Sequence, residues 1–106
     1  ETFLSLARWV DAIEVFNSRC LLQVDNESAA AIARQLHLPG TAGSDAHAAI
    51  EIGRAGLELP PFYDAATLRH SLATARTVGR LSSPGVHAYS VVARWRNDLR
   101  ARGFLP

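Results

Sequence analysis

Several residue types are missing or scarce, and each absence limits what the chain can be. The 106 residues include no methionine and no lysine, and Cys20 is the single cysteine. One cysteine cannot form an internal disulfide or a zinc site built from several cysteines. No apolar run approaches the roughly 18 residues that a membrane-spanning helix needs, so we expect no membrane span.

The start of the sequence also lacks two patterns. Position 1 is not methionine, so Glu1 is not a natural translation start and we expect the chain to be a piece of a longer protein. A basic stretch followed by an apolar stretch, which marks a secretory signal, is missing as well. We therefore expect a cytoplasmic protein.

The composition indicates a folded chain. Hydrophobic residues make up 48% and charged residues 20% of the sequence, which excludes a disordered or fibrous protein. The length fits one domain or a piece of one. The formal net charge of +1 gives no strong attraction to nucleic acid or to membranes.

Short β-like runs alternate with runs of helical period, a pattern typical of α/β proteins. Asp25 or Asn26 is expected to cap the first long helix, and Asp64 the second. A closed eight-unit barrel needs roughly 200 residues, so the two or three βα units here fit only a portion of one. The pattern predicts strands at 12–17, 41–44, 52–59 and 77–81 and helices at about 25–36, 64–75 and 86–102.

The most informative motif is Gly43-Ser44-Asp45-Ala46-His47. If the backbone stays extended there, Asp45 and His47 point to the same side, because strand side chains alternate with a period of two. A carboxylate and an imidazole on one side form half of a site for zinc, manganese or iron. The alternative is a helix-capping Asp beside a surface histidine, which the spacing alone leaves open.

A longer series of motifs gives this turn a context. The turn follows Ile13-Glu14-Val15-Phe16-Asn17 and a capped helix, and it precedes Glu51-Ile52-Gly53, the run from Gly79 to Pro84, and His87. In this order the motifs resemble the closing part of the PHP (polymerase and histidinol phosphatase) family. The resemblance covers nearly the whole chain.

The resemblance implies that residues 1–106 are the C-terminal portion of a PHP domain whose N-terminal portion is absent. It implies the last two or three βα units of a distorted (β/α)7 barrel with two or three divalent zinc, manganese or iron ions at its strand ends. The family's Asp-x-His metal ligands map onto Asp45 and His47. Its His-x-His ligands have no counterpart here, so we expect the isolated chain to bind metal weakly and to be inactive.

Three polar residues around the first strand are further candidates. Glu14 lies in an apolar strand, where a buried carboxylate is costly unless paired. It is expected either to orient a metal ligand or an arginine, or to form a structural ion pair. Asn17 and Arg19 share a face if the backbone stays extended and could bind a substrate phosphate; otherwise they are a turn-forming Asn and a solvated Arg. In a regular strand Glu14 would point away from Asn17.

Most other polar and aromatic residues are expected to be structural. Cys20 lacks a motif that would supply a base, so a small buried side chain is expected. Trp9 and Trp95 are expected in the core, and His87 is expected either to contact substrate or to have a capping or packing role. Nucleic-acid binding is not favoured, because no binding motif accompanies the arginines of the last helix. These arginines are Arg94, Arg96, Arg100 and Arg102.

Two functions remain open. The first is the C-terminal part of a phosphoesterase that hydrolyses phosphate esters with a metal-activated water. Its partner is a small phosphorylated substrate or a nucleotide, and no residue of this chain is assigned as the catalytic group. The second is a non-catalytic α/β module that regulates or binds nucleic acid. Missing upstream units would expose an apolar edge, so we expect the chain to self-associate.

Overall fold

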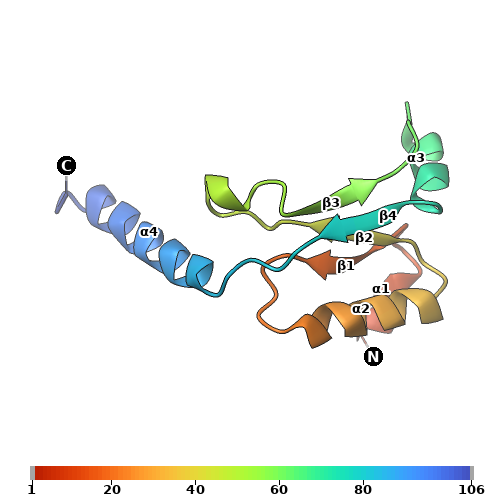
Figure 1. Ribbon diagram of the computed structural model, residues 1–106, viewed down its shortest axis with the longest axis horizontal. Coiled ribbons are helices and arrows are strands. Elements are labelled where there is room, and N and C mark those ends of the chain that lie inside the picture. The colour runs from red at the N-terminus through yellow and green to blue at the C-terminus, as the bar shows by residue number, and fades with distance from the viewer. Residues whose placement is uncertain (1, 106) are drawn as a thin grey trace.

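The computed structural model describes residues 2–105, and its long elements follow the predicted order (Figure 1). No helix in this range is both long and apolar enough to span a membrane. The elements are α1 (Thr2–Ala7), β1 (Ile13–Asn17), α2 (Gln23–Gln35), β2 (Gly40–Gly43), the 3₁₀ turn η1 (Ala49–Glu51), β3 (Ala55–Glu58), α3 (Ala65–Leu72), β4 (Arg76–Gly79) and α4 (Gly85–Ala101).

The described strands form two sheets of two strands each. β1 and β2 are parallel, with Ile13 opposite Gly40 and Asn17 opposite Gly43. β3 and β4 are antiparallel, with Ala55 opposite Gly79. The predicted α/β class is therefore confirmed.

A partial barrel is not confirmed. The strands within residues 2–105 form no closed barrel. The β3–β4 pair is antiparallel, whereas the strands of a (β/α) barrel are parallel. The reason is the position of α3, which lies beyond the end of the β3–β4 pair rather than across its face (Figure 1). The chain therefore enters β4 from the end at which it left β3.

The parallel pair positions the candidate site. α2 packs on β1, and β2 lies beside both β3 and β4 (Figure 1). Because β1 and β2 are parallel, their carboxyl ends lie at one edge, and the N–H of Ser18 donates to the carbonyl of Gly43 at 3.0 Å. The segments after Asn17 and after Gly43 are consequently neighbours.

The helix boundaries agree closely with the sequence pattern at α4 and differ at α2 and α3, since α3 ends at Leu72, three residues before its predicted end. The Asp64 cap is confirmed, because its Oδ1 accepts from the Thr67 N–H at 2.8 Å. α4 lies within one residue of its predicted bounds. The Asp25 or Asn26 cap is wrong: α2 begins two residues earlier, after Leu22, which makes no side-chain capping bond.

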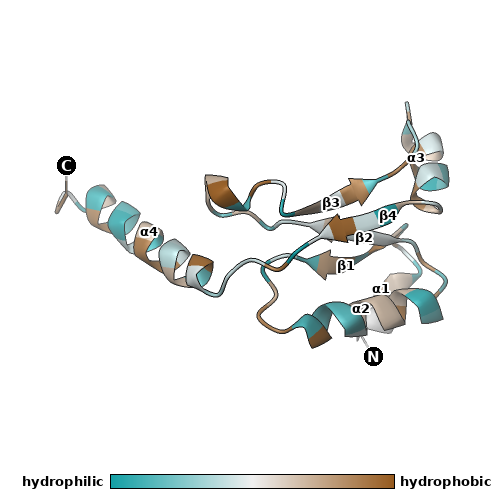
Figure 2. Ribbon diagram, viewed as in Figure 1, coloured by the Kyte–Doolittle hydropathy of each residue, from teal (hydrophilic) through white to brown (hydrophobic). Residues whose placement is uncertain are grey.

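Little apolar surface is buried. The buried apolar residues among residues 5–105 are Ala7, Ile13 and Ala33. Trp9 and Trp95 are 80% and 64% exposed, so their predicted place in the core is wrong. Figure 2 shows apolar residues on η1 and along α4, and α4 projects away from the sheet without a buried residue.

Candidate functional site

The turn after β2 brings the two predicted metal ligands together. Asp45 Oδ1 lies 3.8 Å from His47 Nδ1, and both side chains are about half exposed (50% and 48%). The backbone is not extended, because Asp45 has a left-handed φ of 48°, a conformation in which Asp is enriched. The pair therefore converges through a turn and not through the strand alternation that the sequence suggested.

A hydrogen bond fixes which ring nitrogen of His47 is available. His47 Nδ1 lies 2.7 Å from the backbone carbonyl oxygen of Asp45. A carbonyl oxygen only accepts, so Nδ1 must carry the proton and the neutral ring keeps its lone pair on Nε2. Metal-binding histidines commonly use this arrangement, in which one nitrogen donates to a carbonyl and the other binds the ion.

The donor set suits a divalent cation but is incomplete within this chain. A carboxylate oxygen and a neutral imidazole nitrogen are ligands for zinc, manganese and iron. Residues 2–105 contain no group of three His, Cys, Asp or Glu side chains placed to hold one ion. Asp45 and His47 therefore fit a metal as two members of a larger ligand set.

The end of β1 differs from a regular strand. A β-bulge between Glu14 and Phe16 shifts the register against β2. As a result Glu14 and Asn17 lie on the same side, and the Asn17 amide donates to Glu14 Oε1 at 2.8 Å. Glu14 is exposed and not buried as expected, and it contacts neither an arginine nor a metal ligand through a hydrogen bond or ion pair among the described residues.

Asn17 is surrounded by structural hydrogen bonds. Its Oδ1 accepts from the backbone N–H of Arg19 at 2.8 Å. Its own backbone N–H and carbonyl bond the side chain of Asn26 at 2.9 and 3.2 Å. These contacts agree with the alternative that Asn17 is a turn-forming residue. Phosphate binding by Asn17 stays a prediction.

Arg19 and Glu51 form a buried ion pair. Arg19 Nη1 lies 2.8 Å from both Oε1 and Oε2 of Glu51, whose side chain is fully buried. Glu51 Oε2 also accepts the backbone N–H of His47 at 3.0 Å. The guanidinium of Arg19 is thus bound within the chain, and a direct contact with a substrate phosphate stays a prediction.

Glu51 is ionised despite its burial. Burial alone would raise the pKa of this carboxyl. The hydrogen bond from His47, the charge of Arg19 and the Arg19 hydrogen bonds outweigh burial and place the pKa of Glu51 below its ordinary value. The pair therefore carries two opposite charges that satisfy each other.

Arg19 also connects to α4. Its Nη2 donates to Ser90 Oγ at 3.2 Å and lies 3.5 Å from His87 Nδ1. Next to it, the hydroxyls of Ser18 and Ser82 are 3.0 Å apart, and the Ser82 N–H donates to the Ser18 carbonyl at 2.6 Å. These contacts anchor the first turns of α4 at the end of β1.

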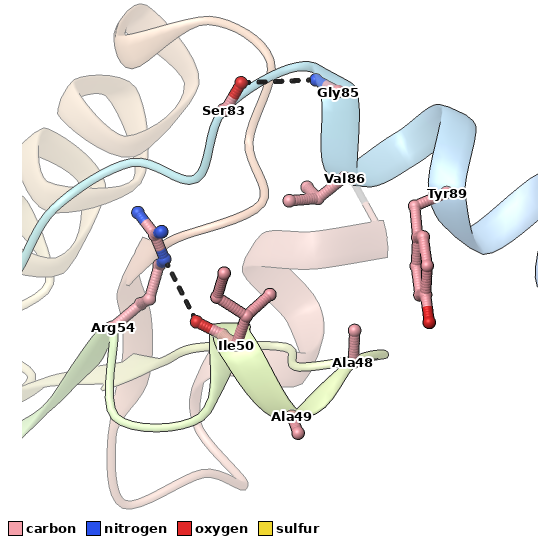
Figure 3. A pocket seen from close by; sticks show the side chains of 8 residues that line it. All are labelled: Ala48, Ala49, Ile50, Arg54, Ser83, Gly85, Val86 and Tyr89. Carbon is pink, nitrogen blue, oxygen red and sulfur yellow. Dashed lines mark hydrogen bonds between the residues drawn. The ribbon is translucent and has the colours of Figure 1, made fainter.

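A cleft lies beside these contacts. It has a volume of about 500 Å³ and separates η1 from the beginning of α4 (Figure 3). Ala48, Ile50, Val86 and Tyr89 supply apolar walls, and Arg54 stands at one end. The cleft adjoins the turn of the predicted metal ligands in sequence, because Ala48 follows His47 directly.

The electrostatic surroundings at the strand ends are acidic. Burial raises the pKa of the Cys20 thiol, and the carboxylates of Asp25, Glu14 and Asp45 raise it further. A thiol held protonated is a poor nucleophile, which agrees with a structural role for Cys20. The same carboxylates favour a cation at this edge of the sheet.

The sequence profile of the PHP-associated family matches residues 23–79, more than half of the chain. The chain belongs to the PHP-associated family. The matched PHP-associated segment runs from the start of α2 to the end of β4 and includes Asp45, His47 and Glu51. The resemblance to the C-terminal part of a PHP protein is thereby confirmed. The comparisons with curated proteins and with solved structures found no match.

Glu51 is the site residue that sequence reasoning did not assign. A single acid between Ile50 and Ile52, four residues after a candidate metal ligand, was the available signal, since a carboxylate among apolar residues needs a buried partner. The same reasoning pointed to Glu14, which the bulge leaves exposed. The buried partner of Arg19 is therefore Glu51.

Proposed function

We propose that this chain is the C-terminal part of a metal-dependent phosphoesterase that hydrolyses small phosphorylated compounds or nucleotides. Asp45 and His47 supply two ligands of a centre with two or three zinc, manganese or iron ions. The remaining ligands come from a portion of the PHP domain that precedes Glu1, and the strands here belong to the distorted barrel of that domain. Family membership supports this role.

The observation that carries the proposal is the geometry of the turn after β2. The Asp45 carboxylate lies beside the His47 ring, and the carbonyl of Asp45 directs the lone pair of the ring to Nε2. When bound, the ions would lower the pKa of a water and offset charge on the phosphoryl oxygens. The chain's own contribution is to present an anionic oxygen and a neutral nitrogen together.

The neighbouring residues have supporting parts in this proposal. Asn17 and Arg19 lie at the strand end where a phosphate would approach, and Glu14 adds negative charge beside Gly43. The cleft between η1 and α4 offers apolar walls to the organic part of the ester. Each contact with substrate follows from the proposed role and is open to mutation.

Metal binding and hydrolysis in the full-length protein test the proposal. We expect Asp45→Ala to lower Zn²⁺ or Mn²⁺ affinity at least tenfold, measured by competition with a chelator, and to abolish metal-dependent phosphatase activity on a substrate panel. Asp11→Ala is the matched control, because Asp11 is an exposed acid paired with Arg69. Wild-type affinity and activity in Asp45→Ala would refute the role of Asp45 as a metal ligand, and a wild-type protein without metal binding or metal-dependent activity would favour a non-catalytic module.

The 106-residue chain alone gives a second test. Two ligands hold an ion poorly, so this chain should bind Zn²⁺ or Mn²⁺ weakly and show no metal-dependent phosphatase activity. Activity in a purified sample of this length would show that the ligand set proposed to precede Glu1 is not needed.

A further inference from the structure

We infer that the buried Arg19–Glu51 ion pair positions the metal-binding turn by holding the backbone of His47, an inference that rests on the proposed function. Glu51 accepts the His47 N–H at 3.0 Å while Arg19 binds both of its oxygens at 2.8 Å. The Glu51 carboxylate thus fixes the backbone of His47, the residue whose side chain presents Nε2. Glu51 is a positioning residue, because no ligand contact is assigned to it.

The pair joins three segments, namely the end of β1, η1 and α4. Arg19 is itself held at the end of β1 by the bond from its N–H to Asn17 Oδ1. Glu51 belongs to η1, and Arg19 also donates to Ser90 on α4. The guanidinium of Arg19, acting through Glu51, therefore connects the turn that bears Asp45 and His47 to the sheet and to α4.

A purely stabilising role explains this arrangement poorly. Replacing a buried ion pair by apolar side chains is often neutral or stabilising, because two charges must be desolvated. Here the buried ion pair holds the backbone amide of His47. That amide belongs to a turn in which Asp45 has a left-handed backbone and the side chains of Asp45 and His47 are half-exposed. Residues that orient metal ligands have this character, and their loss typically weakens metal affinity about 10–100-fold.

The experiment compares Glu51→Gln with two other variants in the full-length protein. Gln keeps the size but loses the charge that binds Arg19. We expect Zn²⁺ affinity, measured by competition with a chelator, to fall about 10–100-fold. Asp11→Asn breaks the exposed Asp11–Arg69 pair, which has the same 2.8 Å length, and should leave affinity within about twofold of the wild type, well short of that loss.

Asp45→Ala separates the two hypotheses. If Asp45→Ala weakens Zn²⁺ binding and Glu51→Gln does not, the positioning role is wrong and the proposed function survives. If Asp45→Ala leaves binding unchanged, the proposed function itself fails. If both weaken binding and Asp11→Asn does not, the inference is supported.

A spectroscopic readout distinguishes positioning from general destabilisation. In metal-free protein the ¹⁵N shifts of the His47 ring should show a proton on Nδ1, and Glu51→Gln should shift them toward a tautomer mixture. The exposed His70 ring on α3 is an internal control that should not change. Unchanged His47 shifts in Glu51→Gln would overturn the inference.

Hydrogen exchange in the unaltered protein tests the hold of Glu51 on the His47 amide even if Glu51→Gln does not fold. The His47 amide is bonded to a buried carboxylate and should exchange at least tenfold more slowly than the Ala46 amide, for which the structure gives no hydrogen bond. Exchange of the His47 amide at the rate of an unfolded peptide would overturn the inference.

Discussion

Asn26 acts between two elements although it lies within one helix. It is buried on α2, and its side-chain amide bonds both the N–H and the carbonyl of Asn17. An asparagine can do this because one side of its amide donates and the other accepts. It thereby replaces the strand partner that the end of β1 lacks on this side.

We predict that Asn26→Ala destabilises the chain by about 1–3 kcal/mol, the cost of leaving a buried backbone group without a partner. Urea unfolding, followed by circular dichroism, measures the change. Asn97→Ala is the matched control, since Asn97 is exposed on α4 and its loss should change stability by less than about 0.5 kcal/mol. Equal effects of the two substitutions would contradict the bridging role.

The structural role of a residue was predictable from the sequence where its contacts are local. The Asp64 cap and the pairing of Asp45 with His47 depend on neighbours within three residues, and the structure contains both. Asn26 was one of two expected helix caps, and the partner of Arg19 was not identified. Their actual contacts span 9 and 32 positions of the chain, and such contacts have no local signature.

At the scale of elements, the close approach of β4 to its neighbours depends on a missing side chain. A Cβ at Gly79 would lie 2.7 Å from the Cβ of Ala55 and 2.8 Å from the ring of Phe16. Both distances are shorter than side-chain carbons adopt, so any larger residue must push β4 away from β3 and from β1. Gly79 thus keeps the two small sheets in contact.

We predict that Gly79→Ala destabilises the chain by about 1–3 kcal/mol, as overpacking typically does. Gly56→Ala provides the control in the same strand pair, because a Cβ at Gly56 meets nothing within 4 Å. There the added methyl should be neutral or slightly stabilising, since it reduces the freedom of the unfolded chain. Thermal unfolding of both variants decides the point, and a smaller loss at Gly79 than at Gly56 would be inconsistent with it.

The existence of each element was easier to predict than its geometry. Alternating apolar runs and turn residues indicated all four strands and the three long helices. The bulge at Glu14 and the antiparallel direction of β4 were not predictable, because both depend on pairing between strands. The predicted strand from 52 to 59 is shorter in the structure, since η1 and a left-handed Gly53 precede it.

At the scale of the whole molecule, the shape differs from that of a compact domain. The radius of gyration is 17.2 Å, whereas a compact chain of this length has about 13 Å. The projecting α4 accounts for much of the difference (Figure 1). Val91, Val92 and Trp95 form an exposed apolar stripe on α4.

An exposed stripe of this kind favours association. Burying one valine side chain contributes about 1.5–3 kcal/mol, and tenfold in affinity corresponds to about 1.4 kcal/mol. In the complete protein we propose that the preceding part of the domain covers α4. In the 106-residue chain alone, a second copy is the available partner, so the chain should form dimers or larger species through α4.

Two charge-introducing variants of α4 test this association. Val92→Asp places a carboxylate in the apolar stripe and should weaken self-association at least tenfold, because a charge is costly to bury without a partner. Asn97→Asp adds the same charge on the polar side of the same helix and should leave the association constant nearly unchanged. Sedimentation equilibrium over a range of concentrations measures both constants. A wild-type chain that stays monomeric at the highest concentration would contradict the association, and equal weakening by the two variants would show that the apolar stripe of α4 is not the surface through which copies meet.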